Sequence, residues 1–161
     1  MWRVTATNEA RENVLRIAAT GGCQCGAVRY AATLANSEAY WCHCRMCQRA
    51  TGGVAAALVS VRRDAVVWTA REPDRFASSP IAKRGYCAVC GTPLTFEFNE
   101  GSENMDLTVG SLDDPSILRL ASHFGTESWV PHWIHIDSLP MTRTDENAAL
   151  MARWAAAKSE P

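Results

Sequence analysis

In Cys42-His43-Cys44-Arg45-Met46-Cys47, three thiols lie within six residues in the nested spacing C-x-C-x-x-C. The remaining four of the seven cysteines form two pairs, Cys23 with Cys25 and Cys87 with Cys90. A structural zinc ion is closed by four protein ligands, whereas a catalytic zinc ion has three and keeps one position open. The division into four and three therefore predicts one closed and one open metal site.

The composition is that of a globular domain, with 161 residues of which 47% are hydrophobic and 20% charged. The formal net charge is −1 and Lys and Arg form no cluster, so nucleic acid is not expected as the main partner. Residues 1–20 have no unbroken apolar segment, and the longest apolar run, 54–59, is too short to span a bilayer. We therefore expect a cytoplasmic protein that contacts no membrane.

A reducing compartment favours metal binding over disulfides in a cysteine-rich chain, and all-sulfur ligation favours zinc over an iron–sulfur cluster. In an extended C-x-C, both thiols point to the same face, so Cys23 and Cys25 can reach one metal. Gly91 directly follows the pair Cys87 and Cys90 and lets the backbone aim its N–H groups at the thiolates. On spacing alone, two pairings stay open: the C-x-C with the distant C-x-x-C, or with part of the central cluster.

Short stretches of alternating polar and apolar residues predict a mainly β fold with few helices. Residues 54–69 are expected to form a hairpin, and residues 48–53 a glycine-rich loop that leaves the central cluster. Further strands are expected over residues 27–31, 37–41, 92–98, 105–109 and 118–123.

The two ends of the chain are expected to lie outside the β domain. A helix is predicted from Thr144 to about Ala156, and residues 8–18 form either a short helix or a frayed arm. The expected organisation is an N-terminal arm or short helix over 1–20, a zinc-binding domain over 21–140, and a C-terminal helix packed on it over 141–161.

Three segments carry a family resemblance: G-C-Q-C-G-A-V-R-Y at 22–30, C-H-C-R-M-C-Q-R-A-T-G at 42–52 and C-A-V-C-G-T at 87–92. Residues 110–115 and 133–140 add to it. The sequence resembles the glutathione-dependent formaldehyde-activating family, whose relatives include the centromere protein V domain, over about residues 21–140.

The resemblance implies a tent-like fold of antiparallel sheets that two zinc ions per chain stabilise. It assigns a structural ion to Cys23, Cys25, Cys87 and Cys90. It assigns the second ion, at the open catalytic site, to Cys42, Cys44 and Cys47. The ion at this second site is expected to be the labile one.

The activity that the resemblance implies is that of a carbon–sulfur lyase or synthase, which joins glutathione to formaldehyde to give S-hydroxymethylglutathione. We expect the partners to be glutathione or another small thiol, and formaldehyde or another small aldehyde. Two other classes remain open: a non-catalytic zinc module that recruits a protein or nucleic acid, and a zinc buffer or thiol-redox sensor. A homodimer is compatible with the sequence.

Candidate substrate-binding residues lie next to the central cysteines. Arg45 and Arg49 are candidates to hold the carboxylates of glutathione, and Gln48 and Thr51 are candidate pocket residues by their position in the expected loop. His43 is expected to point away from the metal if its C-x-C is extended. Core or surface roles are expected for the other histidines, His123, His132 and His135.

Overall fold

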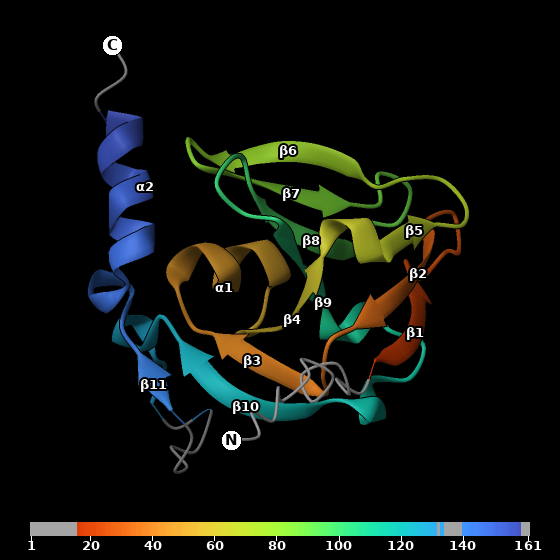
Figure 1. The fold of residues 1–161 in the computed structure, drawn as a ribbon, viewed down its shortest axis with the longest axis horizontal. Coiled ribbons are helices and arrows are strands. Elements are labelled where there is room, and N and C mark those ends of the chain that lie inside the picture. The colour runs from red at the N-terminus through yellow and green to blue at the C-terminus, as the bar shows by residue number, and fades with distance from the viewer. Residues whose placement is uncertain (1–15, 132, 134–139, 159–161) are drawn as a thin grey trace, which may run out of the picture.

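Two β-sheets of unequal size make up most of the computed structural model, which describes residues 16–131, 133 and 140–158 (Figure 1). The smaller sheet is antiparallel, in the order β1-β2-β5. Its strands are β1 (Ile17–Gly22), β2 (Arg29–Leu34) and β5 (Val66–Trp68). An isolated bridge between Gly21 and Leu112 joins β1 to the segment that follows the larger sheet's strand β9.

The larger sheet has the strand order β11-β10-β3-β4-β9-β8-β7-β6. Strand β10 pairs in parallel with both β3 and β11, and the remaining pairs are antiparallel. The strands are β3 (Glu38–Cys42), β4 (Ala56–Arg62), β6 (Asp74–Ser79), β7 (Ala82–Tyr86), β8 (Pro93–Phe98), β9 (Asn104–Thr108), β10 (Arg119–Phe124) and β11 (Met141–Thr142).

Strand β4 lies between the main core and the central cysteines. On one face, Val59 and Val61 pack in the core formed with Tyr30 and Leu34 of β2. On the opposite face, Ala56 and Leu58 pack against the central cysteines, since alternate residues of a strand point to opposite sides. The same strand therefore supports the fold and one wall of the candidate site.

The α-helices of the described residues are α1 (Arg45–Thr51), which connects β3 to β4, and α2 (Ala148–Lys158), which follows β11 and η6. Figure 1 shows α2 along one side of the molecule, beside α1 and the ends of β6 and β7. Short 3-10 turns complete the structure: η2 (Arg63–Ala65), η3 (Val109–Ser111), η4 (Pro115–Ile117), η5 (Thr126–Ser128) and η6 (Thr144–Glu146). No helix in the described part of the chain is long and apolar enough to cross a membrane.

The expected mainly β fold with a C-terminal helix is confirmed. The predicted hairpin over 54–69 is wrong, because β4 pairs with β9 in the larger sheet whereas β5 pairs with β2 in the smaller one. The expected loop over 48–53 is instead largely helical, as α1 shows.

At the N-terminus, β1 begins at Ile17 and so includes residues that the sequence placed in the arm or helix. The rest of the predicted helix over 8–18 lies outside the described residues, apart from Arg16. The division of the chain at residues 20 and 140 stays a prediction.

Candidate metal centres and the cavity beside them

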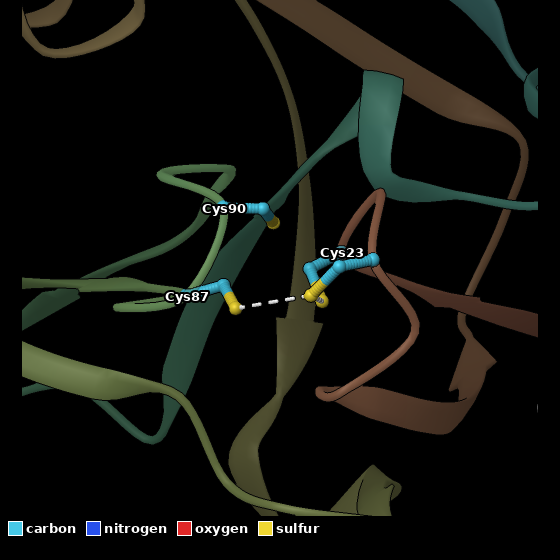
Figure 2. Close-up of side chains that lie close together, drawn as sticks. Cys23, Cys87 and Cys90 are labelled. Carbon is cyan, nitrogen blue, oxygen red and sulfur yellow. Dashed lines mark hydrogen bonds between the residues drawn. The ribbon is translucent and has the colours of Figure 1, made fainter.

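The first cysteine cluster joins two loops that are far apart in the sequence. Cys23 and Cys25 follow β1, and Cys87 and Cys90 lie between β7 and β8. Their four sulfur atoms all lie within 4.8 Å of one another, with Cys23 and Cys25 at 3.5 Å and Cys25 and Cys87 at 3.8 Å. Figure 2 shows Cys23, Cys87 and Cys90 turned toward a common space. Since the sulfurs of a tetrahedral zinc site are roughly 3.7 Å apart, this donor set fits zinc.

Backbone and hydroxyl groups stabilise thiolates in this cluster. The N–H of Val28 donates to Cys23 Sγ at 3.2 Å. The hydroxyl of Thr92 lies 3.1 Å from Cys90 Sγ, and this hydrogen bond, together with backbone hydrogen bonds of Thr92 and Cys25, lowers the pKa of Cys90 to about 5. The turn between the second pair depends on Gly91, whose φ of 77° is a left-handed conformation that favours glycine.

The second cluster lies where β3 gives way to α1. Cys42 ends the strand, Cys44 caps the helix and Cys47 lies in its first turn, with the three sulfur atoms within 4.8 Å of one another. Cys44 Sγ accepts hydrogen bonds from Cys42 and from the backbone N–H of Cys47, and these bonds lower the pKa of Cys44. Three thiols in this arrangement would hold a zinc ion and leave its fourth position open.

A buried arginine contacts the second cluster from β7. Arg84 is 7% exposed and donates from Nη2 to Cys47 Sγ at 3.2 Å, while its guanidinium lies 4.9 Å from the centre of the Phe96 ring. Three thiolates on one Zn²⁺ would carry one excess negative charge. The guanidinium of Arg84 would offset that charge and orient the Cys47 thiolate.

The segment after β10 packs tightly against Cys44. The N–H of His43 donates to the carbonyl of Phe124 at 2.8 Å, and Gly125 has a φ of 67°. A Cβ on Gly125 would lie 2.9 Å from the backbone nitrogen of Cys44. Glycine at position 125 therefore allows the backbone after β10 to approach the backbone of Cys44 closely.

Two buried histidines lie beside this cluster without joining it. His43 Nε2 is 2.9 Å from His123 Nδ1, and the His43 ring stacks on Trp129 with the ring centres 4.5 Å apart. Burial lowers the pKa of His43, which favours the neutral imidazole. Neither histidine belongs to the group of three sulfurs, and His132 and His135 lie outside the described residues.

A cavity of about 430 Å³ opens beside the second cluster. All three of its cysteines line this cavity, as do Arg84 and Asp106. Pockets of roughly 300 to 1,000 Å³ are typical of small-molecule sites. The four cysteines of the first cluster do not line it. Only the second cluster is therefore placed to act on a small molecule held in this cavity.

Asp106 is a partly buried carboxyl group in the wall of the cavity. It accepts a hydrogen bond of 2.9 Å from the hydroxyl of Tyr40. Burial raises its pKa from 3.8 to about 6, against the lowering effect of that hydrogen bond. A carboxyl group with such a pKa can accept and return a proton near neutral pH.

A protein-family model matches most of the chain. A family model described as "Glutathione-dependent formaldehyde-activating enzyme" matches residues 18–129, well over half of the chain. The chain belongs to this family. The matched range includes all seven cysteines, Arg84 and Asp106, but not α2.

One solved structure similar to this member of the family is the crystal structure of a structural-genomics target from Rhodobacter sphaeroides. It is 22% identical in sequence, with a TM-score of 0.49, and the alignment covers 76% of this chain and 99% of that one. Among curated proteins, none matches the chain.

Three of the four predicted substrate-binding residues of this family member lie on the side of α1 away from the cavity. Arg45, Gln48 and Arg49 line a separate groove with Trp133, and this groove shares no lining residue with the cavity at the cysteines. The Gln48 amide donates to the carbonyls of Val54 and Ser128 at 3.0 and 2.9 Å, which ties two loops together.

The fourth of these residues, Thr51, lines neither the groove nor the cavity. Its hydroxyl donates to the carbonyl of Cys47 at 2.9 Å, within α1. A role of any of the four residues in substrate binding stays a prediction.

Sequence reasoning missed Arg84, Asp106 and Tyr40. The one hint for Arg84 is that β7 places it with Ala82 on a buried face, where an unpaired cation would be costly. Asp106 lies in β9 between the buried Met105 and Leu107. Its side chain therefore points to the opposite face of the strand, and nothing in the sequence indicates what lies against that face.

Replacing Asp106 with asparagine is expected to remove a pH-dependent part of the stability. The pKa of about 6 in the folded chain lies above the ordinary 3.8, so the native state binds this proton more tightly than the unfolded state does. The free energy of unfolding of the wild type therefore falls as pH rises from about 4 to about 6, by on the order of 3 kcal/mol, and the variant lacks this fall.

Urea unfolding of both proteins across this pH window measures the effect as the difference between them. Both proteins have the same cysteines, so loss of metal at low pH cancels in that difference. A difference that stays constant from about pH 4 to about pH 6 would contradict the raised pKa.

Proposed function

We propose that the chain is a zinc-dependent carbon–sulfur lyase or synthase that joins a small thiol to formaldehyde or another small aldehyde. Glutathione is the first candidate for the thiol, in keeping with the family. The observation that carries the proposal is that the three-cysteine cluster lines a cavity of small-molecule size, whereas the four-cysteine cluster does not. Two zinc ions per chain and a cytoplasmic location belong to the same proposal.

The two clusters would have different roles. Cys23, Cys25, Cys87 and Cys90 would hold a structural zinc ion that ties the start of the smaller sheet to the β7–β8 turn. Cys42, Cys44 and Cys47 would hold the second ion. When bound there, zinc supplies an open Lewis-acid position that lowers the pKa of a thiol or polarises a carbonyl oxygen.

The addition needs one bond to form and one proton to move. The thiol sulfur bonds to the carbonyl carbon, the π electrons of the C=O bond go to oxygen, and the proton from sulfur ends on that oxygen. The product is a hemithioacetal, and the reverse sequence is the lyase direction. Neither direction needs an oxidant or a reductant.

The protein's own groups in the cavity support these steps. Arg84 holds the thiolate of Cys47 and balances the charge of the cluster. The carboxyl of Asp106, oriented by the hydroxyl of Tyr40, would take the proton from the incoming thiol and return it to the new oxygen. Arg84 is buried, and its low exposure to water strengthens its interaction with the Cys47 thiolate.

The alternative of a non-catalytic zinc module requires a protein side chain to cap the second ion. Among the residues that the structure describes, no fourth cysteine, histidine or carboxylate joins the group of three sulfurs. The cavity at the cluster is a further reason to prefer the enzyme. A homodimer stays a prediction.

Exchange NMR tests the proposed activity. The measured quantity is the rate of exchange between free glutathione with formaldehyde and S-hydroxymethylglutathione, which also proceeds without protein. Zinc-loaded wild type is expected to exceed the protein-free rate, and the Cys47→Ser variant is expected to match it, because two thiolates cannot complete the three-sulfur site. Wild type that gives no acceleration would contradict formaldehyde as a substrate.

A further inference from the structure

The cavity at the second cluster is much larger than formaldehyde requires. Its volume is about 430 Å³, whereas an apolar protein cavity of about 150 Å³ is enough to hold benzene. A one-carbon aldehyde would leave most of the cavity to water. The remaining volume is enough for a further group of a substrate.

The wall of the cavity is largely apolar and aromatic. It is built from strands of the larger sheet, from α1 and from α2. Its large apolar members include Leu58, Phe96, Phe98, Phe124, Leu150 and Trp154. Burying a hydrocarbon group against such a wall is favourable in proportion to the apolar area removed from water.

The positive charges of the cavity are already engaged. Two arginines line it in the described part of the chain, Arg84 and Arg153. Arg84 donates to the sulfur of Cys47. Arg153 lies 4.0 Å from the centre of the Phe98 ring and donates to the carbonyl of Gly101 at 2.9 Å. A substrate group that carries two carboxylates would find no unengaged pair of cations against this wall and would meet the carboxyl of Asp106, so the group that lies here is expected to be uncharged.

Helix α2 completes the cavity through four residues of one face. Ala149, Leu150, Arg153 and Trp154 line it, while Met151 does not. This arrangement follows from the helical period, which places residues three and four apart on one face. Figure 1 shows α2 beside α1, and α1 carries Cys47. The cavity-lining face of α2 therefore lies on the same side as the second cluster.

We propose that the cavity takes a neutral, apolar group, about the size of a phenyl ring or a branched alkyl chain, on the aldehyde or the thiol that reacts at the second cluster. This inference rests on the proposed function for its reaction and names the substrate class. The apolar wall of α2 and the sheet binds that group, and the three-cysteine end of the cavity receives the reacting carbonyl or sulfur.

A binding experiment tests the cavity without using the reaction. The probe is 2-phenylethanol, a neutral alcohol that forms no hemithioacetal, and the readout is the indole N–H resonance of Trp154 in the zinc-loaded protein, assigned through Trp154→Phe. Wild type is expected to show a saturable shift. Leu150→Lys is expected to weaken binding about tenfold or more, because it places a charge in the apolar wall.

Met151→Lys is the matched control, since it adds the same charge to the same helix outside the cavity. It is expected to bind as wild type does, and circular dichroism checks that both variants fold. No saturable shift in wild type would overturn the inference, as would equal weakening by the two lysine variants.

A rate experiment then tests the proposed substrate class separately from the proposed reaction. Acceleration over the protein-free exchange rate is compared for three pairs: glutathione with formaldehyde, glutathione with phenylacetaldehyde, and phenylmethanethiol with formaldehyde. We expect one of the phenyl-bearing pairs to be accelerated about tenfold more than the first pair, and Leu150→Lys to remove that preference. The pair that gains shows whether the aldehyde or the thiol carries the apolar group.

The failures of the two proposals are distinguishable. Acceleration of the formaldehyde pair without gain for either phenyl-bearing pair would overturn the substrate class and keep the proposed function. Saturable binding of 2-phenylethanol with no acceleration of any pair would overturn the thiol–aldehyde reaction, and with it the assignment of these substrates, while the apolar cavity would stand as a binding site.

Discussion

Replacing Cys87 with serine is expected to remove one zinc ion per chain and to lower the free energy of unfolding by several kcal/mol. Cys87 is fully buried and belongs to the cluster that links β1 to the β7–β8 turn. The binding free energy of a structural zinc ion, about 10–16 kcal/mol for zinc-finger peptides, contributes directly to folding. A variant with three of the four thiols keeps only part of this energy.

The measurements are zinc content by atomic emission and the urea unfolding curve. Val89→Ser is the matched control, since Val89 lies in the same turn and is 69% exposed. It is expected to keep both zinc ions and the wild-type unfolding midpoint. Unchanged zinc content in Cys87→Ser would show that the four cysteines do not hold a metal.

Replacing Arg84 with methionine is expected to weaken zinc binding at the three-cysteine cluster by about ten- to a hundredfold. Loss of a group that orients a metal ligand has this typical cost. Methionine keeps most of the aliphatic volume but removes the donor to Cys47 Sγ and the charge that offsets the thiolates. Leaving one partner of a buried charge pair alone is also expected to reduce stability by roughly 3–5 kcal/mol.

Competition with a chromophoric chelator measures the two affinities in one titration. Lys83→Met is the control, because Lys83 is the neighbour of Arg84 on β7 and faces Glu97 instead of the cysteines. It is expected to leave both affinities unchanged. Equal weakening of the two zinc sites in Arg84→Met would contradict a specific link between this arginine and Cys47.

The cysteines could be found from the sequence because their spacing itself carries the chemistry. C-x-C and C-x-x-C place two thiols within reach of one ion whatever the rest of the fold does. Spacing alone leaves two pairings of the half-sites open. The structure brings Cys23 and Cys25 next to Cys87 and Cys90, which supports the first pairing.

The cavity could not be found in this way, because it depends on contacts between distant segments. Arg84 meets Cys47 across 37 positions of sequence, and Tyr40 meets Asp106 across 66. No local periodicity of the sequence encodes such a contact. The lining of the cavity also requires α2 to lie against the end of the sheet, which the helical pattern of residues 148–158 does not specify.

Two local errors have physical causes. Helix α1 was not predicted for two reasons. Its N-cap is the thiol of Cys44 instead of the usual serine or aspartate, and the helix ends at Gly52 after only seven residues. The hairpin over 54–69 was predicted from a plausible turn, but η2 redirects the chain so that β5 joins the other sheet.

The most direct test of one closed and one open site is cadmium-113 NMR of the protein with both zinc ions replaced by cadmium. The account predicts two resonances, of which the four-sulfur one is indifferent to added glutathione and the three-sulfur one moves as the thiol enters its open position. Two resonances that both stay unchanged on addition of glutathione and of phenylmethanethiol would contradict the account, because the second cluster would then be closed by a group of the protein.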